Sequence, residues 1–212
     1  MTALKLFYRY PACSIVSHIA LEEAGLPFEA RRVDFQNADD MAEVKKFNPK
    51  GAVPTLVADG KGLSENVAIC SYIDSLAPQA KLFPADPFTR AQCVSFLAWG
   101  ASTVHINFRM SFRPERFTSD AAQVEAVRAQ GRTNFWKNLE TIDEILQKQD
   151  WVIGNAFTIA DGYALRFWDW GRITKHPVED LKAFTKHKDR MIARPAVKRV
   201  LEREDSPLVA KV

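Results

Sequence analysis

Cys13 and Ser14 stand where a strand-like segment gives way to a helix-like one, and a thiol at such a junction can be chemically active. Leu4 to Tyr8 is strand-like, and Pro11 follows shortly after it. Because proline cannot continue a strand ladder, the strand is predicted to have ended by Pro11 and a helix to begin near Cys13 or Ser14. The first amides of a helix and its positive dipole end can lower the pKa of a thiol from about 8.5 by one to several units. The alternative is a buried packing cysteine followed by a serine that only caps the helix.

The cysteines indicate one-thiol chemistry in a reducing compartment. Val16 occupies the position of the second cysteine in a Cys-x-x-Cys motif, so a dithiol oxidoreductase is not expected, whereas exchange with a thiol from solution is. The chain has an odd number of cysteines, and they are widely spaced, at Cys13, Cys70 and Cys93. This pattern argues against a disulfide framework and for a cytoplasmic protein. No Cys/His cluster has the spacing of zinc ligands, and no metal is expected.

Two further segments have the chemistry to hold a peptide-like ligand. The Val53-Pro54 step lies at the entry to a predicted strand, and a cis peptide bond there would turn the N–H and C=O of Val53 outward. Ser64 is predicted to cap a helix whose first turn contains Glu65. Helix amides could then bind a ligand carboxylate, and Glu65 a ligand ammonium group. The alternatives are an ordinary turn and simple capping.

These residues belong to a predicted α/β unit in which strands and helices alternate in the order β-α-β-α-β-β-α. The first β-α-β is predicted to be parallel and right-handed, and a closing hairpin through Asp59-Gly60 makes the sheet mixed. Gly25 sits where a helix C-cap belongs. The predicted segments are, in order, 4–8, 14–24, 28–33, 39–47, 55–58, the residues near Leu63, and 65–76.

A proline-rich stretch at 77–87 is predicted to be a linker, and every segment beyond it is predicted to be helical. Apolar residues recur along 119–149 at helical spacing, which is typical of core. Thr158 and Asp161 have capping-box spacing and are interpreted as structural. The predicted domains are 1–78 and 88–212, and the predicted helices of the second are 89–110, 119–149, 158–170, 178–193 and one starting at Pro195.

The overall composition excludes several classes of function. The 212 residues are 47% hydrophobic and 26% charged, with 29 Lys and Arg against 26 Asp and Glu, a globular profile whose net charge of +3 gives no reason to expect nucleic-acid binding. No apolar run is long enough to span a membrane, and the N-terminus lacks the apolar region of a secretory signal. No membrane or nucleic-acid partner is therefore expected.

In this order and spacing, the motifs resemble those of the cytosolic glutathione transferases, and most closely the bacterial beta class. The class pattern Tyr-x-x-Pro-x-x-Cys-Ser is similar, with slightly different spacing, to the segment from Tyr8 to Ser14. The Asn-Pro-Lys-Gly-x-Val-Pro segment matches residues 48–54. The remaining matches are Glu65, Ala68 and Ile69 for Glu-x-x-Ala-Ile, Val104-His105, the Phe-Thr-x-Ala-Asp segment at 157–161, and Trp170.

The resemblance implies a thioredoxin-like α/β N-terminal domain, an all-α C-terminal domain and a homodimer with glutathione as co-substrate. Glutathione would place its cysteinyl backbone on Val53, its γ-glutamyl end at Glu65 and Asn66, and its sulfur near Cys13. The implied catalytic residues are Cys13, Ser14, Tyr8 and His105; the glutathione-binding residues are Val53, Pro54, Glu65, Asn66 and Lys50; the pocket for the second substrate is Pro11, Phe108, Phe112 and Trp170.

The chain departs from the family pattern at several positions. Asn66 replaces the usual Ser or Gly, and Ala38 lies near the place of a lysine that would meet the glycyl carboxylate, for which Arg32 and Lys50 are possible replacements. Ala98 and Ile106 also replace an asparagine and a lysine of the class.

The predicted function is conjugation of the glutathione thiol to an electrophilic, aromatic small molecule, with thiol–disulfide exchange at Cys13 as a further possibility. Tyr8 competes with Cys13 and Ser14 as the group that activates the thiol. Residues 106–117 mix aromatic side chains with three arginines, which is typical of either a solvated helix end or a pocket for an acidic aromatic compound. The alternatives are a non-catalytic interaction module of this fold and a specialised glutathione-dependent lyase, isomerase or dehalogenase.

Overall fold

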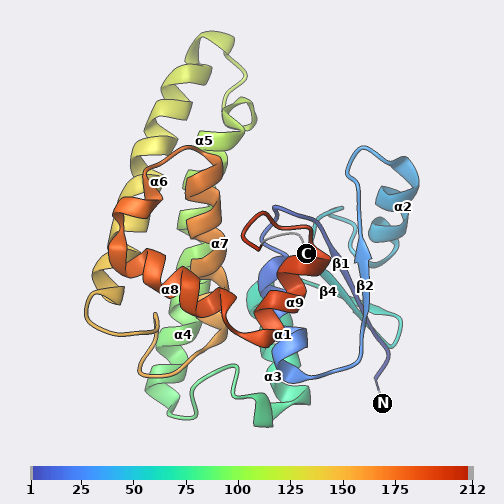
Figure 1. Cartoon of the computed structure of the whole chain (residues 1–212). Coiled ribbons are helices and arrows are strands. Elements are labelled where there is room, and N and C mark those ends of the chain that lie inside the picture. The colour runs from blue at the N-terminus through green and yellow to red at the C-terminus, as the bar shows by residue number, and fades with distance from the viewer. Residues whose placement is uncertain (1, 210–212) are drawn as a thin grey trace. The chain divides into compact units, whose positions relative to one another are not determined.

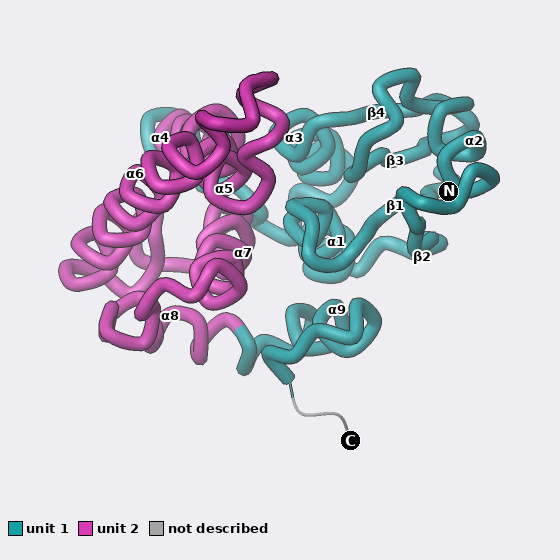
Figure 2. The backbone as a smooth tube through the Cα atoms, turned by 90° about the horizontal axis from the view of Figure 1, so that it is seen from above, with its two compact units in different colours: residues 1–90, 192–212 teal, residues 91–191 magenta. Residues whose placement is uncertain are grey.

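The computed structural model describes residues 2–209, which fold into two compact units (Figures 1 and 2). Unit 1 contains the chain up to Arg90 and again from Ile192 on, and unit 2 is Ala91–Met191. This division differs from the predicted sequence domains 1–78 and 88–212, whose residues 1 and 210–212 lie outside the described part. The reason is the last helix, α9 (Pro195–Arg203), which packs on α1 (Ile15–Ala24) in unit 1.

Unit 1 is built on a four-stranded mixed sheet with the order β2-β1-β3-β4. The prediction of a parallel first pair and a closing hairpin is confirmed: β1 runs parallel to β2, and β3 is antiparallel to both β1 and β4. The register places Leu6 opposite Ala30 on one side and Leu56 on the other. The strands are β1 (Leu4–Tyr8), β2 (Glu29–Arg32), β3 (Thr55–Ala58) and β4 (Lys61–Ser64).

The two faces of this sheet bury alternate residues of the same strands. Phe7 and Val57 pack with Val44 of α2 (Ala38–Phe47) in one cluster. Because successive side chains of a strand point to opposite faces, Leu6 and Leu56 face the other side. Helices α1 and α3 (Asn66–Leu76) cover that side (Figure 2). The sheet therefore holds the start of α1 and the start of α3 on one face.

Local sequence signals explain some of the helix ends. Gly25 ends α1 in the left-handed conformation at φ 64°, as predicted. Asn37 caps α2, since its side chain accepts from the amides of Asp39 and Asp40. The prediction that Ser64 caps α3 is wrong, because strand pairing with Thr55 keeps Ser64 in β4. The N-cap position of α3 is Glu65.

Unit 2 is helical, as predicted, although the predicted helix 89–110 is divided. A π-helical segment, Gly100–Val104, separates α4 (Pro87–Trp99) from α5 (His105–Phe112). The other long helices are α6 (Val124–Leu146), α7 (Ile159–Ile173) and α8 (Lys182–Ile192). Short 3₁₀ turns occur at Pro78–Ala80, Pro114–Arg116, Ala121–Gln123 and Val178–Asp180.

Helix α7 is the centre of unit 2, since almost all of its residues are buried. The predicted capping box is present at its start, where Thr158 and Asp161 bond to each other's backbone. Helix α6 approaches α5 so closely that a side chain at Gly131 would lie 2.5 Å from the amide nitrogen of Ser111. Among the helices of residues 2–209, none has the length and apolar character needed to cross a membrane.

Candidate active site

Cys13 lies immediately before α1, as predicted, and is 8% exposed. Its Sγ is 4.0 Å from the carbonyl oxygen of Val53, on the loop that enters β3. Its own carbonyl oxygen accepts from the Val16 amide at 3.1 Å and from the Asn66 side chain at 3.0 Å. The fold therefore brings together Cys13, Val53 and Asn66, three of the residues predicted to form the glutathione site.

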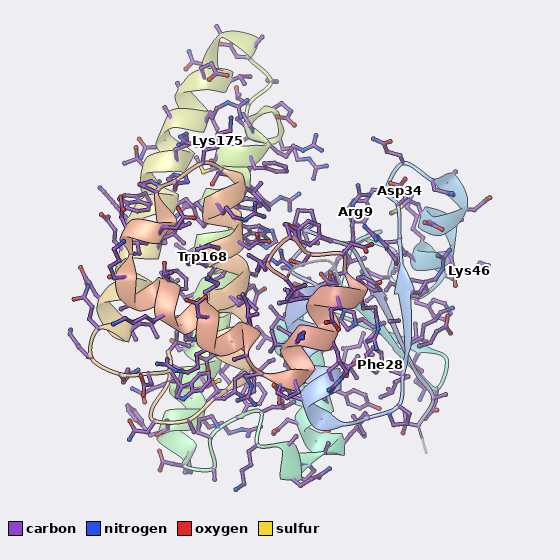
Figure 3. The ribbon with its side chains drawn as sticks, viewed as in Figure 1. Arg9, Phe28, Asp34, Lys46, Trp168 and Lys175 are labelled. Atoms are coloured by element: carbon purple, nitrogen blue, oxygen red, sulfur yellow. The ribbon has the colours of Figure 1, made fainter. Side chains whose placement is uncertain are left out.

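Ser14 occupies the N-cap position of α1, yet its side chain makes no capping bond. Its fully buried Oγ instead accepts from the amide of Arg9 at 3.1 Å and donates to the carbonyl of Arg9 at 3.2 Å. These two bonds close the loop between β1 and α1. On the same loop, Arg9 forms an ion pair with Asp34, with Nη1 and Oδ1 separated by 3.0 Å (Figure 3).

Tyr8 is directed toward α9. Its hydroxyl donates to the main-chain oxygen of Arg203 at 3.3 Å, and its ring lies 4.7 Å from that of His18. Burial, followed by the negative charge of Glu204, raises the pKa of the Tyr8 phenol above its usual value of 10.0. At pH 7 the phenol is therefore protonated and able to donate.

The loop before β3 has a cis peptide bond at Val53-Pro54, and a second cis bond occurs at Tyr10-Pro11 in the loop before α1. The Asn48 side chain holds the first loop in place. It donates to the carbonyl of Ala52 at 3.1 Å and to the Thr55 hydroxyl at 2.9 Å. Val53 is thus presented next to Cys13 by a loop that its own polar side chains stabilise.

Glu65 and Lys50 form an exposed ion pair at the start of α3. The Lys50 Nζ is 3.0 Å from Oε1 of Glu65, and the two side chains are 65% and 67% exposed. Glu65 has φ 74° and ψ 123°, a conformation that is uncommon for a residue with a side chain and is concentrated at functional sites. Because the side chains of Lys50 and Glu65 are both largely exposed, a charged ligand group can reach them from solvent.

Asn66 is only 4% exposed, and its amide group is bonded to α1. Its Oδ1 accepts from the Ser17 amide at 3.2 Å and from the Ser17 hydroxyl at 2.7 Å, while its Nδ2 donates to the Cys13 carbonyl. Sequence reasoning assigned this residue to the ligand and missed its contact with α1. The signal was the departure from the usual Ser or Gly of the family.

In unit 2 the predicted pocket residues form one aromatic group. The rings of Trp170 and Phe108 stack at 4.0 Å, those of Phe108 and Phe112 at 5.3 Å, and His105 lies 4.7 Å from Trp170. Phe112 is 43% exposed, whereas Trp170 and Phe108 are buried. Burial, with a smaller contribution from the charge of Arg109, lowers the pKa of His105 to about 4, so its imidazole is neutral at pH 7.

The described residues contain no group of three or more His, Cys, Asp or Glu side chains arranged to hold a metal ion. All three cysteines lie in the described part of the chain and are in the thiol form. The arrangement combines a single thiol next to the Val53 carbonyl with an exposed ion pair of Lys50 and Glu65.

Comparison with known proteins agrees with this arrangement. A family model described as the glutathione S-transferase N-terminal domain matches residues 12–76, and the corresponding C-terminal domain model matches residues 102–195. The chain is 35% identical over 208 residues to glutathione S-transferase GstA of Escherichia coli O157:H7, which covers 95% of this chain and 98% of the relative.

Solved structures lead to the same family. A glutathione transferase homologue from Sulfitobacter with bound glutathione has a TM-score of 0.86 at 29% identity, covering 96% of this chain and 99% of that one. A beta-class glutathione S-transferase from Sphingomonas chungbukensis has a TM-score of 0.84 at 30% identity, covering 97% and 100%.

This chain belongs to the glutathione S-transferase family. The predicted fold, a thioredoxin-like unit together with a helical unit, is confirmed. The prediction of an enzyme of this family and the resemblance to its bacterial beta class are confirmed as well.

Proposed function

We propose that this protein binds glutathione in unit 1 and transfers its thiol to an electrophilic, aromatic small molecule. The observation that carries the proposal is the position of Cys13, whose sulfur lies at the start of α1 and 4.0 Å from the Val53 carbonyl. A tripeptide paired with the main chain of Val53 would have its own sulfur beside Cys13. Pro54 follows Val53 in this loop. Cys13, assisted by Ser14, is the group proposed to activate the thiol, Tyr8 is the lower-ranked candidate for that role, and His105 is proposed to lie beside the second substrate.

The ends of glutathione would be held by charge. Glu65 would pair with the γ-glutamyl ammonium group, displacing Lys50 from its exposed ion pair. Lys50 would then be available to a ligand carboxylate. Arg32 pairs with Asp205 at 2.7 Å and its side chain is 50% exposed, against 65% for Lys50. We therefore propose Lys50 as the more accessible replacement for the lysine missing near Ala38.

The reaction requires the thiolate of glutathione. A thiol of pKa about 8.5 is about 3% ionised at pH 7, and lowering its pKa by two units requires about 2.7 kcal/mol of preferential thiolate stabilisation. A helix N-terminus together with one or two hydrogen bonds supplies this amount. The thiol proton passes to solvent, the thiolate forms a bond to the electrophilic carbon, and the leaving group departs with its bonding electrons.

Thiol–disulfide exchange is proposed as a second reaction at the same thiol. The Cys13 thiolate would attack one sulfur of oxidised glutathione, forming a mixed disulfide as the old disulfide bond breaks and releases glutathione thiolate. Cys13 has no second cysteine nearby in sequence to resolve this adduct, so a second glutathione thiolate from solution would complete the cycle.

Within unit 2, the residues proposed to bind the aromatic substrate are Phe108, Phe112 and Trp170. The support from unit 2 is the stack of three rings that runs from buried Trp170 to exposed Phe112. The guanidinium of Arg113 lies 5.7 Å from the Phe112 ring, which adds a positive charge beside the exposed end of the stack. An aromatic substrate with an acidic group fits this combination.

The test combines binding, adduct formation and turnover. Incubation with oxidised glutathione is expected to add about 305 Da, one glutathionyl group, at Cys13, and Cys13→Ala should abolish the adduct while Cys93→Ala, which removes a fully buried thiol, retains it. An adduct that persists in the Cys13→Ala protein would contradict the assignment.

Two further measurements separate the alternatives. A protein that neither binds glutathione-agarose nor turns over a chloronitroarene would be a non-catalytic module. Turnover confined to one ether, isomerisable or haloalkane substrate within a panel of electrophiles would indicate a specialised lyase, isomerase or dehalogenase. We also propose a cytoplasmic homodimer, for which light scattering should give twice the chain mass of 23.9 kDa.

A further inference from the structure

The start of α1, beside the proposed thiol site, receives no capping bond from its own N-cap side chain. Ser14 is the N-cap residue, and its side chain bonds to Arg9 instead of to the helix. The first turn also contains no acidic residue. Since the first four amides of a helix have no partner within the helix, a partner from elsewhere is needed where the end is buried.

Asn66 supplies this partner from another helix. A capping side chain accepts from the second or third amide after the N-cap, and Ser17 is the third residue after Ser14. Its amide donates to Oδ1 of Asn66 at 3.2 Å, and its hydroxyl donates to the same oxygen at 2.7 Å. Asn66 therefore caps α1 across 49 residues of sequence, and both it and Ser17 are buried.

The second bond of Asn66 acts on Cys13 directly. Its Nδ2 donates to the Cys13 carbonyl oxygen at 3.0 Å, and the Val16 amide donates to the same oxygen at 3.1 Å. A trans peptide group is planar, with its C=O and N–H on opposite sides. Fixing the carbonyl of Cys13 therefore also fixes the direction of the Ser14 amide and the position from which the Cys13 side chain leaves the backbone.

We infer that Asn66 is a positioning residue for Cys13, which caps α1 from the first turn of α3 and sets the orientation of the Cys13 peptide. This inference rests on the proposed function of Cys13. Asn66 directly follows Glu65 at the start of α3, so one residue connects the proposed γ-glutamyl end of the site with its sulfur end. Asn66 acts through α1, and its amide faces Cys13 and Ser17.

The test measures Cys13 itself, without glutathione. The rate of iodoacetamide alkylation is followed against pH by mass spectrometry of the tryptic peptide 10–31, which contains no other cysteine. In Asn66→Ala the midpoint of this profile is expected to rise by about half a pH unit, because the Cys13 peptide and the first turn of α1 lose the bonds that orient them relative to each other. Asn66→Ser, which leaves a small polar group in the buried site, is expected to shift it in the same direction and serves if the alanine variant does not fold.

Ser17→Ala is the matched control. It removes the hydroxyl bond to Oδ1 of Asn66 but retains the Ser17 amide bond and the bond to Cys13, so its alkylation midpoint should equal that of the wild type. An unchanged midpoint in folded Asn66 variants, together with a raised KM for glutathione, would mean that Asn66 binds the ligand directly and would overturn the inference. An unchanged midpoint with only a lower melting temperature would reduce Asn66 to a structural cap and would overturn it equally.

Failure of the proposed function has a different signature. If Cys13→Ala retained full turnover, Cys13 would not be the proposed catalytic thiol, yet the alkylation midpoints of the Asn66 variants would still report whether Asn66 sets the state of Cys13.

Discussion

The hydroxyl of Tyr8, at the end of β1, donates to the main-chain oxygen of Arg203, at the end of α9, over 3.3 Å and 195 residues of sequence. This bond joins the first strand of unit 1 to its last helix. The phenol is thereby engaged with α9, whereas the sulfur of Cys13 lies against the loop at Val53. Stability and thiol chemistry are therefore expected to respond differently to changes at Tyr8 and at Cys13.

Tyr8→Phe should lower the free energy of unfolding by about 1 kcal/mol, because it removes one partly buried hydrogen bond. Conjugation of a chloronitroarene should stay within about twofold of the wild type, since removal of a group that stabilises charge in a transition state typically costs about a hundredfold or more. Denaturant unfolding and steady-state kinetics measure the two effects. A hundredfold loss of kcat in a stably folded Tyr8→Phe protein would identify Tyr8 as the activating group.

Glu22→Gln should weaken the attachment of α9 to α1. Glu22 is 11% exposed and accepts from Arg199 at 2.9 Å and from Arg203 at 2.6 Å. Burial raises its pKa, but the hydrogen bonds from the two arginines outweigh burial and leave the pKa below 4.5. We expect Glu22→Gln to lower the free energy of unfolding by about 1.5 kcal/mol at pH 7, allowing for the partial exposure of both arginines.

The effect of Glu22→Gln on the free energy of unfolding should depend on pH. A carboxylate whose pKa is depressed by folding stabilises the protein above its unfolded pKa, and this contribution is lost as the pH falls through the folded value. The difference between wild type and Glu22→Gln should therefore narrow below about pH 4.5. Glu125→Gln is the control, since Glu125 is 79% exposed in its ion pair with Arg128 and should change stability by less than about 0.5 kcal/mol.

Asp161→Ala should lower the free energy of unfolding by far more than the substitution of an ordinary capping residue does. Asp161 is fully buried, and its Oδ1 accepts from the Val152 amide at 2.9 Å and contacts His187 Nε2 at 2.8 Å, while its Oδ2 accepts from the Thr158 amide. Removing the Asp161 carboxylate leaves several buried donors without an acceptor. We therefore expect Asp161→Ala to lower the free energy of unfolding by about 4 kcal/mol. Thr158→Ala, which removes only the capping hydroxyl, should cost about 1 kcal/mol.

Chemical denaturation of the two variants makes the comparison, and Asp161→Asn, which retains one acceptor oxygen, should fall between them. Equal losses for Asp161→Ala and Thr158→Ala would show that the capping box alone accounts for the role of Asp161.

His105 should make the protein less stable as the pH falls from about 6.5 to 4. Burial and the charge of Arg109 lower its pKa to about 4 in the folded state, whereas an unfolded histidine titrates near 6.5. Between these values the unfolded chain binds a proton that the folded chain does not, so stability rises with pH. As the pH falls from about 6.5 to 4, the free energy of unfolding of the wild type should therefore decrease by about 2 kcal/mol relative to that of His105→Gln, after allowance for partial exposure.

Unfolding free energies at several pH values measure this difference, which should be constant above pH 7. A difference that does not vary with pH would mean that the imidazole titrates alike in both states. The proton resonances of the His105 ring provide an independent check, since they should not change between pH 5.5 and 8.

The sequence alone predicted the features that depend on neighbouring residues. Pro11 predicted that the chain leaves the first strand before Cys13, and β1 ends at Tyr8 while Cys13 lies at the start of α1. Gly25 supplied the left-handed C-cap of α1, and Thr158 with Asp161 formed the capping box. Apolar periodicity separated an α/β region from a helical one. Each of these signals works over a few residues, because backbone conformation and capping are decided by local sterics and local hydrogen bonds.

Only the tertiary structure decided which distant groups meet. Strand pairing with Thr55 kept Ser64 in β4, so the N-cap of α3 is Glu65 and not Ser64, and the contact between α1 and α3 turned Asn66 toward Cys13. The return of α9 to α1 brought Arg203 to Tyr8. No local pattern encodes these contacts, because they depend on how helices pack against a shared sheet and on the bonds that buried polar groups must then find.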